Sequence, residues 1–384
     1  MIKLIKQAQV YAPEYLGRQD VLVCGEKIAD IRPTLQGFDD LEQVEIIEAN
    51  GAILAPAYID IHEHVTGGGG EQGFASRVPE IKLSDLTLAG VTTVVGLLGT
   101  DSETRSLENL YAKTYALEME GITAYMLTGA YPYPPKTMTG SVSRDITLID
   151  KVIGVKSSIS DHRSSNMSEQ ELIRLASDAR LGGLISGKQG ITILHVGSGE
   201  AKLSLLFEAL THSDIPISKL LPTHVSRTKE LLNEAVRFAK LGGTIDFTAG
   251  DDGGTAKSIH YALEQGVDIA RITMSSDACG SIPRFDQEGR CTGLTYTLPS
   301  ILHTELLRLI KEYKLPLEAA LKLLTRNPAE VLGISDRKGA IAKGLDADFI
   351  IYDDALVIKQ VFAKGSWMVK DGKAVKKGRF EGVE

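Results

Sequence analysis

Residues 59–64, the segment Ile59–His64, read Ile-Asp-Ile-His-Glu-His, a short apolar run that ends in two histidines. Successive side chains of a β-strand point to opposite faces, so His62 and His64 share one face and Glu63 points to the other. Two imidazoles that converge in this way are able to bind one metal ion. The motif alone is weak evidence, because histidines at a strand end also occur without a metal. Its place in the fold therefore decides its meaning.

Similar apolar runs recur between residues 56 and 339 at intervals of about thirty residues, the length of one strand–helix unit. Such runs, apolar on both faces, are typical of a buried parallel sheet, and the segments between them have the apolar spacing of helices. No GxGxxG motif follows the first run, which disfavours an open dinucleotide-binding sheet. Eight units predict a (β/α)₈ barrel of the TIM type, with strands at Tyr58–His62, Thr92–Leu98, Ala124–Thr128, Ile153–Ser157, Thr192–Val196, Lys219–His224, Thr244–Thr248 and Arg271–Ser275.

Both ends of the chain read as short strands separated by turns. Asp20–Cys24 and Lys27–Ile31 lie near the start, and Asp348–Tyr352, Val357–Ala363 and Trp367–Lys370 lie near the end. Because the two ends of a chain are often neighbours, we expect one small β-sandwich domain built from residues 1–55 and 340–384. The barrel domain would then occupy residues 56–339.

Composition narrows the class of protein. The 384 residues are 43% hydrophobic and 24% charged, as in ordinary globular proteins. The net charge of −8, without a Lys/Arg cluster of five to eight residues, disfavours nucleic acid as a partner. No apolar run reaches the roughly 18 residues of a membrane span, and no signal-peptide core follows the N-terminus. Three cysteines without a CxxC pair fit a reducing cytoplasm.

Three further metal-ligand candidates fall at or near the carboxyl ends of predicted strands: His195, His224 and Asp277. In a barrel these ends meet at one mouth, where active sites are built. Histidine together with carboxylate suits zinc and similar divalent ions, and a water bound at an open coordination position ionises near neutral pH. The pattern therefore predicts a metal-dependent hydrolase.

Lys156 lies within the fourth predicted strand. An ammonium group in the interior of a barrel is costly to desolvate, so something must neutralise it or pair with it. One interpretation is a buried pair of Lys156 with a carboxylate. The other is a carboxylated lysine whose carbamate bridges two metal ions. The residues alone leave both open.

The combined pattern resembles the binuclear amidohydrolase superfamily, in which HxH, Lys, His, His and Asp follow one another on strands one, four, five, six and eight. Gly339–Asp348 is similar to the return of that superfamily into its small β domain. More narrowly, the chain resembles the isoaspartyl dipeptidase family over nearly its whole length, most closely at His62–Glu71, Gly96–Asp101, Met126–Tyr131, Val155–Arg163 and Ser218–Arg227.

The resemblance implies two Zn²⁺ ions, or other divalent ions, bridged by carboxylated Lys156 and a hydroxide. One ion would be held by His62, His64 and Asp277, and the other by His195 and His224. The hydroxide would attack the amide carbonyl, with Asp277 as general base and acid. Tyr131, which opens a proline-rich loop over the mouth, would stabilise the developing oxyanion.

The implied substrate is a β-aspartyl dipeptide, which carries one ammonium group and two carboxylates. Glu71 would pair with the ammonium, and Arg163 and Arg227 would grip the carboxylates bidentately. Gly69, Thr100 and Ser281 match positions that contact the aspartyl part. From the residues alone, Glu71 reads as an exposed loop acid, the arginines as surface groups and Tyr131 as a packing residue.

This charge set discriminates between functions. A cyclic amidase of the dihydroorotase or hydantoinase type, or a deaminase, would share the metals without needing these charges. A non-catalytic assembly protein of the same fold would lack ligands, and all six positions are filled. The resemblance also implies a cytoplasmic homo-oligomer, with an octamer as one form, that clears isoaspartyl peptides.

Several residues depart from the pattern or are set aside. Glu63 is acidic where an apolar or small residue is expected, and Ala278 and Cys279 differ from the pair associated with the family. Neither departure should touch the metals. His162 is expected to lie behind the ligands at most, and the remaining histidines are expected on the surface or in structural positions: His212, His260 and His303.

Overall fold

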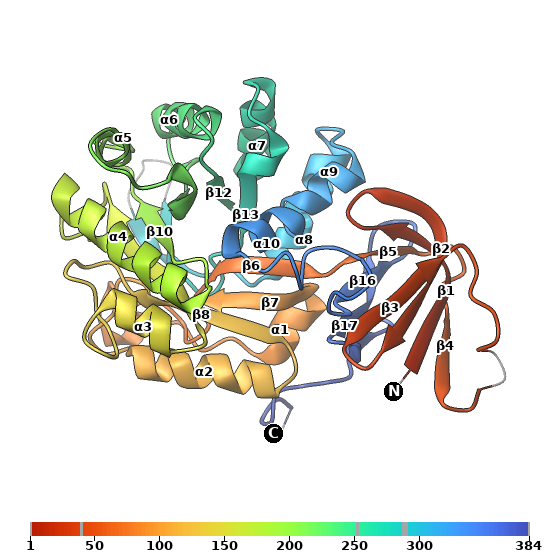
Figure 1. Cartoon of the computed structure of the whole chain (residues 1–384). Coiled ribbons are helices and arrows are strands. Elements are labelled where there is room, and N and C mark those ends of the chain that lie inside the picture. The colour runs from red at the N-terminus through yellow and green to blue at the C-terminus, as the bar shows by residue number, and fades with distance from the viewer. Residues whose placement is uncertain (1, 39–40, 251–252, 286–290, 383–384) are drawn as a thin grey trace.

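A parallel barrel forms the centre of the molecule (Figure 1). The computed structural model describes residues 2–38, 41–250, 253–285 and 291–382. Its barrel strands pair in chain order, and each coincides with one of the eight predicted strands to within a few residues, so the predicted fold class is confirmed. These strands are β6 (Tyr58–Glu63), β7 (Val91–Gly96), β8 (Thr123–Gly129), β9 (Val152–Ile159), β10 (Ile191–Val196), β11 (Leu220–Thr223), β12 (Ile245–Thr248) and β13 (Ile272–Ser275).

The last strand returns to the first at the mouth of the barrel. The Asp277 amide donates to the carbonyl of His62 at 3.0 Å, and the His64 amide donates to that of Ala278 at 3.0 Å. An apolar core that includes Ile61 fills the interior, and α10 (Arg326–Leu332) packs against it. This packing fills the interior of the barrel, so a ligand site is left to the carboxyl ends of the strands.

Helices surround the barrel and pack their apolar faces on the outside of the strands (Figure 1). Most of them follow a strand and lead to the next one, as in repeated βα units. The helices are α1 (Leu83–Leu88), α2 (Leu107–Met119), α3 (Val142–Leu148), α4 (Glu169–Ser186), α5 (Ser204–Thr211), α6 (Lys229–Lys240), α7 (Gly254–Glu264), α8 (Ser300–Lys311) and α9 (Leu317–Lys322).

A nine-stranded sheet combines both ends of the chain beside the barrel (Figure 1). The long strand β1 pairs with three others, and β5 pairs with β16, which joins the N-terminal to the C-terminal strands. Its own core is apolar and separate. The strands are β1 (Ile2–Tyr11), β2 (Tyr15–Cys24), β3 (Lys27–Arg32), β4 (Val44–Glu48), β5 (Ile53–Pro56), β16 (Phe349–Tyr352), β17 (Ile358–Ala363), β18 (Ser366–Lys370) and β19 (Lys373–Ala374).

A hairpin turn at Asp371–Gly372 joins β18 and β19. Both residues have positive φ, 50° and 72°, the backbone conformation of the tight turns that match the twist of paired strands. The domain boundaries after residue 55 and before residue 340 stay a prediction, and β5 itself runs to Pro56.

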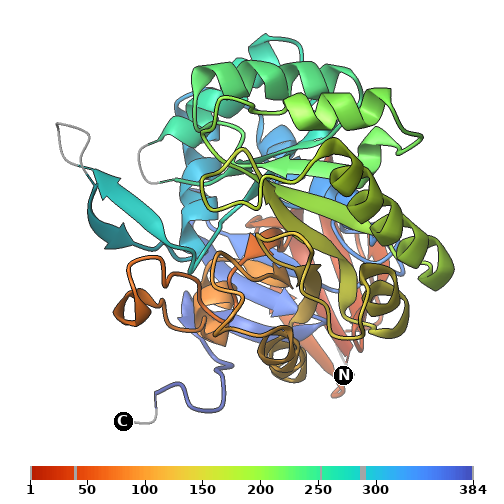
Figure 2. The same cartoon turned by 90° about the vertical axis from the view of Figure 1, so that its left-hand side faces the viewer.

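A second hairpin projects from the mouth side of the barrel (Figure 2). It consists of β14 (Ile282–Phe285) and β15 (Cys291–Thr295), and it follows directly on the segment that carries Asp277. Within the described parts of the chain, no helix is both long and apolar enough to span a bilayer.

Glu63, the unexpected acid of the HxH motif, lies behind the histidines on the outer face of β6. Its side chain is fully buried, and neither carboxyl oxygen has a hydrogen-bond partner among the described residues. Burial, reinforced by the negative charge of neighbouring Asp60, raises the pKa of Glu63 well above its ordinary value. Burial therefore favours the protonated form of Glu63 more strongly in the folded protein than in the unfolded chain.

This raised pKa predicts that Glu63→Gln stabilises the metal-free protein increasingly as the pH rises. In the wild type, the contribution of Glu63 to the free energy of unfolding is fully present below its pKa in the unfolded chain, near 4.5. It declines above that pH, whereas glutamine does not titrate. Each pH unit in this window changes the free energy of unfolding by about 1.4 kcal/mol. Thermal midpoints of wild type and variant at pH 5 and pH 8 measure the effect. The same difference at both pH values would contradict a protonated Glu63, and exposed Glu208→Gln serves as the control.

Candidate metal centre and substrate pocket

A cavity of about 610 Å³ opens at the carboxyl ends of the barrel strands. Most of its lining residues have polar side chains, and they come from several strand ends, as expected for the mouth of such a barrel. The lining residues are His64, Gly69, Glu71, Gln72, Gly99, Thr100, Tyr131, Asp161, His162, Arg163, His195, Ser198, Arg227, Asp277, Gly280, Ser281 and Leu294.

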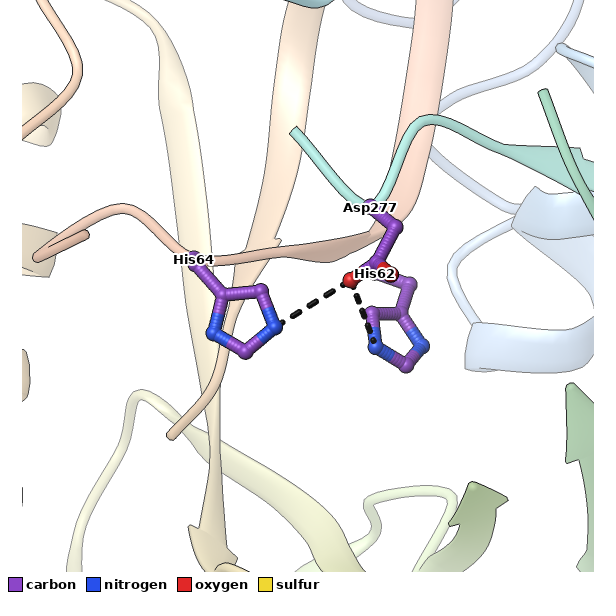
Figure 3. A group of neighbouring side chains, drawn as sticks. All are labelled: His62, His64 and Asp277. Carbon is purple, nitrogen blue, oxygen red and sulfur yellow. Dashed lines mark ion pairs between the residues drawn. The ribbon is translucent and has the colours of Figure 1, made fainter. Parts of the chain in front are cut away.

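His62, His64 and Asp277 form one compact group (Figure 3), and His64 and Asp277 line the cavity. Asp277 Oδ1 lies 3.1 Å from His64 Nε2 and 3.4 Å from His62 Nε2. The ring of His64 fits because residue 99 is glycine: a Cβ there would stand 2.7 Å from His64 Cε1. The two imidazoles therefore converge on one carboxylate oxygen, as the alternation along the strand predicted.

The backbone around Asp277 is tied to the first strand by Asp60. The buried Asp60 carboxylate accepts from the Ser276 amide at 3.2 Å and from the Ser276 hydroxyl, and that hydroxyl accepts from the Ala278 amide at 2.9 Å. Burial pushes the pKa of Asp277 upward, but its hydrogen bond with His64 and the proximity of His62 and Lys156 hold the pKa below its usual range. Asp277 is thus an anion in a fixed position.

Lys156 is fully buried in β9, with Nζ 2.8 Å from His62 Nε2. Among the residues that the structure describes, no carboxylate forms an ion pair with it, so the interpretation as a buried Lys–carboxylate pair finds no support. Burial lowers the pKa of Lys156 to about 7. The amine is therefore an unusually weak base beside the histidine cluster.

His195 and His224 complete the group of imidazoles. Their ring centroids lie 4.5 Å apart, and His224 lies 5.0 Å from His62. His224 Nδ1 is 2.5 Å from Thr248 Oγ1, while its buried Nε2 has no hydrogen-bond partner among the described residues. Burial lowers the pKa of His195 to about 3 and that of His224 well below its ordinary value. Both rings are neutral near pH 7, the form that binds metal ions.

Two residues of the site escaped prediction, Asp161 and Thr248. Asp161 Oδ2 lies 2.8 Å from His195 Nε2, and Thr248 Oγ1 contacts His224 Nδ1 in a similar way. The available signal was their position, because Thr248 is the last residue of β12 and Asp161 follows β9 by two residues.

Glu71 stands on the cavity wall among other predicted substrate-binding residues. It accepts from Ser281 Oγ at 2.7 Å and from Thr100 Oγ1 at 3.1 Å, and Arg163 Nη1 lies 3.4 Å away. Gly69 lines the same wall with a φ of +80°, and a Cβ there would stand 2.3 Å from a backbone oxygen. The side chain of Glu71 is 19% exposed, so it is a held acid and not a free loop carboxylate.

The two arginines differ in their freedom. Asp161 binds Arg163 through Nε at 2.9 Å and Nη2 at 2.8 Å, which uses most of one side of the guanidinium. The other terminal nitrogen of Arg163, Nη1, points toward Glu71. Arg227 lines the cavity and is exposed. A bidentate grip on a substrate carboxylate is therefore open to Arg227 but limited for Arg163.

Tyr131 lies over the histidines, with its hydroxyl 2.7 Å from His195 Nδ1. Burial raises the pKa of Tyr131 above its ordinary value, so the phenol keeps its proton and can donate it in a hydrogen bond. The residue begins the irregular segment 131–140, which runs without helix or strand, as the prolines predicted.

The histidines that were not predicted as metal ligands lie apart from the cluster of His62, His64, His195 and His224, although His162 lines the cavity. The side chain of His162 is 88% exposed, His212 and His260 pair with surface glutamates, and His303 bonds Tyr58 in the packing of α8. Burial raises the pKa of Cys279 to about 12, which leaves it an unreactive thiol.

The cluster fits divalent metal ions. Two buried nitrogens, His224 Nε2 and His64 Nδ1, have no hydrogen-bond partner among the described residues. An unpaired buried polar atom costs free energy, and coordination of a metal ion by one of these nitrogens would remove its share of that cost. Neutral imidazoles together with an ionised carboxylate are the donors that zinc and similar ions prefer. The fold, its mouth and this donor set are those of a hydrolase of the amidohydrolase type, a class of enzymes that is typically metal-dependent.

Comparison with known proteins gives the family. The model of the Amidohydrolase family matches residues 210–368. A solved structure of β-aspartyl dipeptidase from Fervidobacterium islandicum AW-1, in complex with β-Asp-Leu, is 47% identical with a TM-score of 0.91, over 97% of this chain and 98% of that one. The chain belongs to the β-aspartyl dipeptidase family of amidohydrolases.

More distant curated relatives align with most of this chain, but their activities differ from one another. A dihydroorotase from Lactobacillus johnsonii is 28% identical over 92% of this chain and 89% of its own length. A deacetylase from Agrobacterium fabrum is 24% identical over 87% of this chain and 78% of its own length.

Proposed function

We propose that this protein is a dipeptidase that hydrolyses the isopeptide bond of β-aspartyl dipeptides. The observation that carries the proposal is the shared cavity: Glu71, Arg163 and Arg227 line the same wall as His64, His195 and Asp277. The carboxylate of Glu71 and the two guanidinium groups of Arg163 and Arg227 complement the charges of a ligand with one ammonium group and two carboxylates. A relative that is 47% identical binds β-Asp-Leu in its solved structure.

Two divalent ions, zinc by preference, would be held at the base of the cavity. His62, His64 and Asp277 would hold one ion, His195 and His224 the other, and Lys156 in carboxylated form would lie between them. The position of Lys156 supports this assignment, since Nζ stands against His62 without a carboxylate partner among the described residues. Such ions lower the pKa of a bound water and polarise a carbonyl oxygen.

The side chains of the chain supply the remaining steps. The Tyr131 hydroxyl donates a hydrogen bond to the carbonyl oxygen as negative charge develops on it. Asp277 accepts a proton from the attacking water and delivers it to the leaving amine nitrogen as the C–N bond breaks. The products are aspartate and the released amino acid.

Substrate orientation follows from the charges on the wall. Glu71, held by Thr100 and Ser281, would pair with the α-ammonium of the aspartyl residue, with Gly69 close beside it. Arg227 and Nη1 of Arg163, the terminal nitrogen that Asp161 does not bind, would bind the two carboxylates. The cytoplasmic location and the homo-oligomer, with an octamer as one form, stay predictions.

A cyclic amidase remains the second candidate, because a dihydroorotase is among the full-length relatives. The held acid Glu71 argues against it, since a cyclic amide without an ammonium group leaves this carboxylate unpaired. A non-catalytic assembly role is disfavoured by the two imidazoles and the carboxylate of His62, His64 and Asp277, which meet at one point.

Purified, metal-replete protein is expected to hydrolyse β-Asp-Leu, and α-Asp-Leu at least about 100-fold more slowly, because the wrong isomer leaves buried polar groups unpaired. Dihydroorotate should be inert. Released leucine and metal content per chain are measured in parallel, with a chelated sample as the control. Turnover of dihydroorotate without turnover of β-Asp-Leu would replace the proposed function by the cyclic amidase.

A further inference from the structure

We propose that Asp161 is a positioning residue that couples a metal ligand to substrate binding, by orienting His195 and Arg163 with one carboxylate. The proposal rests on the function proposed above. Asp161 was not among the predicted site residues, and its side chain is 4% exposed. It contacts both groups directly and stands beside the cavity that they line.

The first half of the coupling concerns the imidazole of His195. Asp161 Oδ2 accepts from His195 Nε2 at 2.8 Å, which keeps the ring proton on Nε2. The lone pair of Nδ1 then faces Tyr131, whose hydroxyl lies 2.7 Å away. A carboxylate behind a ligating histidine fixes the ring and strengthens it as a donor. Asp161 therefore selects Nδ1 as the atom that His195 offers to a metal ion.

The second half concerns the guanidinium of Arg163. Asp161 Oδ1 accepts from Nε and from the backbone amide of Arg163, both at 2.9 Å, and Oδ2 accepts from Nη2 at 2.8 Å. These bonds fix the plane of the guanidinium and direct Nη1 toward Glu71 at 3.4 Å. The guanidinium carbon also lies 5.2 Å from the centre of the Tyr131 ring. The carboxylate of Asp161 thus fixes the orientation of both the His195 ring and the Nη1 nitrogen of Arg163.

Thr248 provides a natural comparison. Its hydroxyl lies 2.5 Å from His224 Nδ1, so it orients the other histidine of the pair. No hydrogen bond joins the Thr248 side chain to an arginine or to Glu71 among the described residues. Thr248→Val should therefore disturb metal binding alone, whereas Asp161→Asn should disturb both metal binding and substrate binding.

The test compares these two variants with wild type, and uses exposed Asp214→Asn as the matched control. Zinc retained against increasing chelator is measured first, because it needs no activity. KM and kcat for β-Asp-Leu follow at saturating zinc. We expect zinc binding about 10- to 100-fold weaker in both variants, a KM at least about tenfold higher in Asp161→Asn, and a KM near wild type in Thr248→Val.

An Arg163→Ala background isolates the arginine. There, Asp161→Asn should raise KM no further, because the group that Asp161 positions is already gone. Asp161→Glu keeps the charge and guards against a folding defect in the asparagine variant. It should weaken both zinc retention and substrate binding, since the carboxylate is displaced by one methylene.

Unchanged zinc retention in Asp161→Asn would overturn the orientation of His195, and an unchanged KM at full metal content would overturn the coupling to Arg163. An additive rise in KM in the Arg163→Ala background would overturn it equally. If wild type fails to cleave β-Asp-Leu, the proposed function falls. The zinc measurements then still decide whether Asp161 orients the ligand.

Discussion

Asp277→Asn is expected to lower kcat for β-Asp-Leu by a factor on the order of 10²–10⁴, the usual contribution of a general acid–base group. Asparagine keeps the shape of the side chain, but its amide cannot accept a proton from the attacking water. The negative charge that faces His62 and His64 is lost as well. The loss should persist when zinc is added to saturation.

Folding of this variant should be unaffected, because the bonds that hold the segment do not involve the carboxylate. The Asp277 amide binds the His62 carbonyl, and Asp60 binds Ser276. Thermal melting and metal content separate a chemical defect from loss of metal, with Asp214→Asn as the matched control. A kcat within a few-fold of wild type at full metal content would refute the role of Asp277.

Lys156→Met is expected to act in opposite directions on activity and on stability. Methionine fills a similar volume without nitrogen, so the variant cannot carry a carbamate and should lose activity to background together with most of its metal. The metal-free variant should unfold at higher denaturant concentration, because a buried amine without a carboxylate partner among the described residues is removed. The gain is on the order of 1–3 kcal/mol.

Metal analysis and urea unfolding of the metal-free proteins measure both effects. Retention of two metal ions per chain in Lys156→Met would show that Lys156 is not a bridge. A metal-free variant less stable than wild type would show that Lys156 has a structural partner. The conservative core substitution Met126→Leu in neighbouring β8 is a suitable packing control.

The barrel could be predicted because its strands are apolar on both faces and return at a regular interval. The N-terminal strand β1 could not, since Ile2–Tyr11 mixes apolar and polar residues and shows no turn before it. Its stability comes from pairing with β2, β4 and β5, and these are tertiary contacts that no local pattern reveals.

The candidate site divides in the same way. Histidines at strand ends point to a metal because few other roles require them there. Asp161 and Thr248 act through hydrogen bonds to those histidines, and common residue types at loop positions carry no such signal. The limited freedom of Arg163 was equally hidden, because it depends on which nitrogens Asp161 already occupies.

The pairing of β5 with β16 has a consequence for how the chain reaches its fold on the ribosome. These strands are about 300 residues apart in sequence, yet they are neighbours in the sheet, and such distant partners slow folding. During synthesis, β5 waits with an unpaired edge until nearly the whole barrel has emerged. Contact of β1 with β2 and β4 shields the N-terminal strands meanwhile, and the open edge of β5 is where a nascent chain would recruit a chaperone or aggregate.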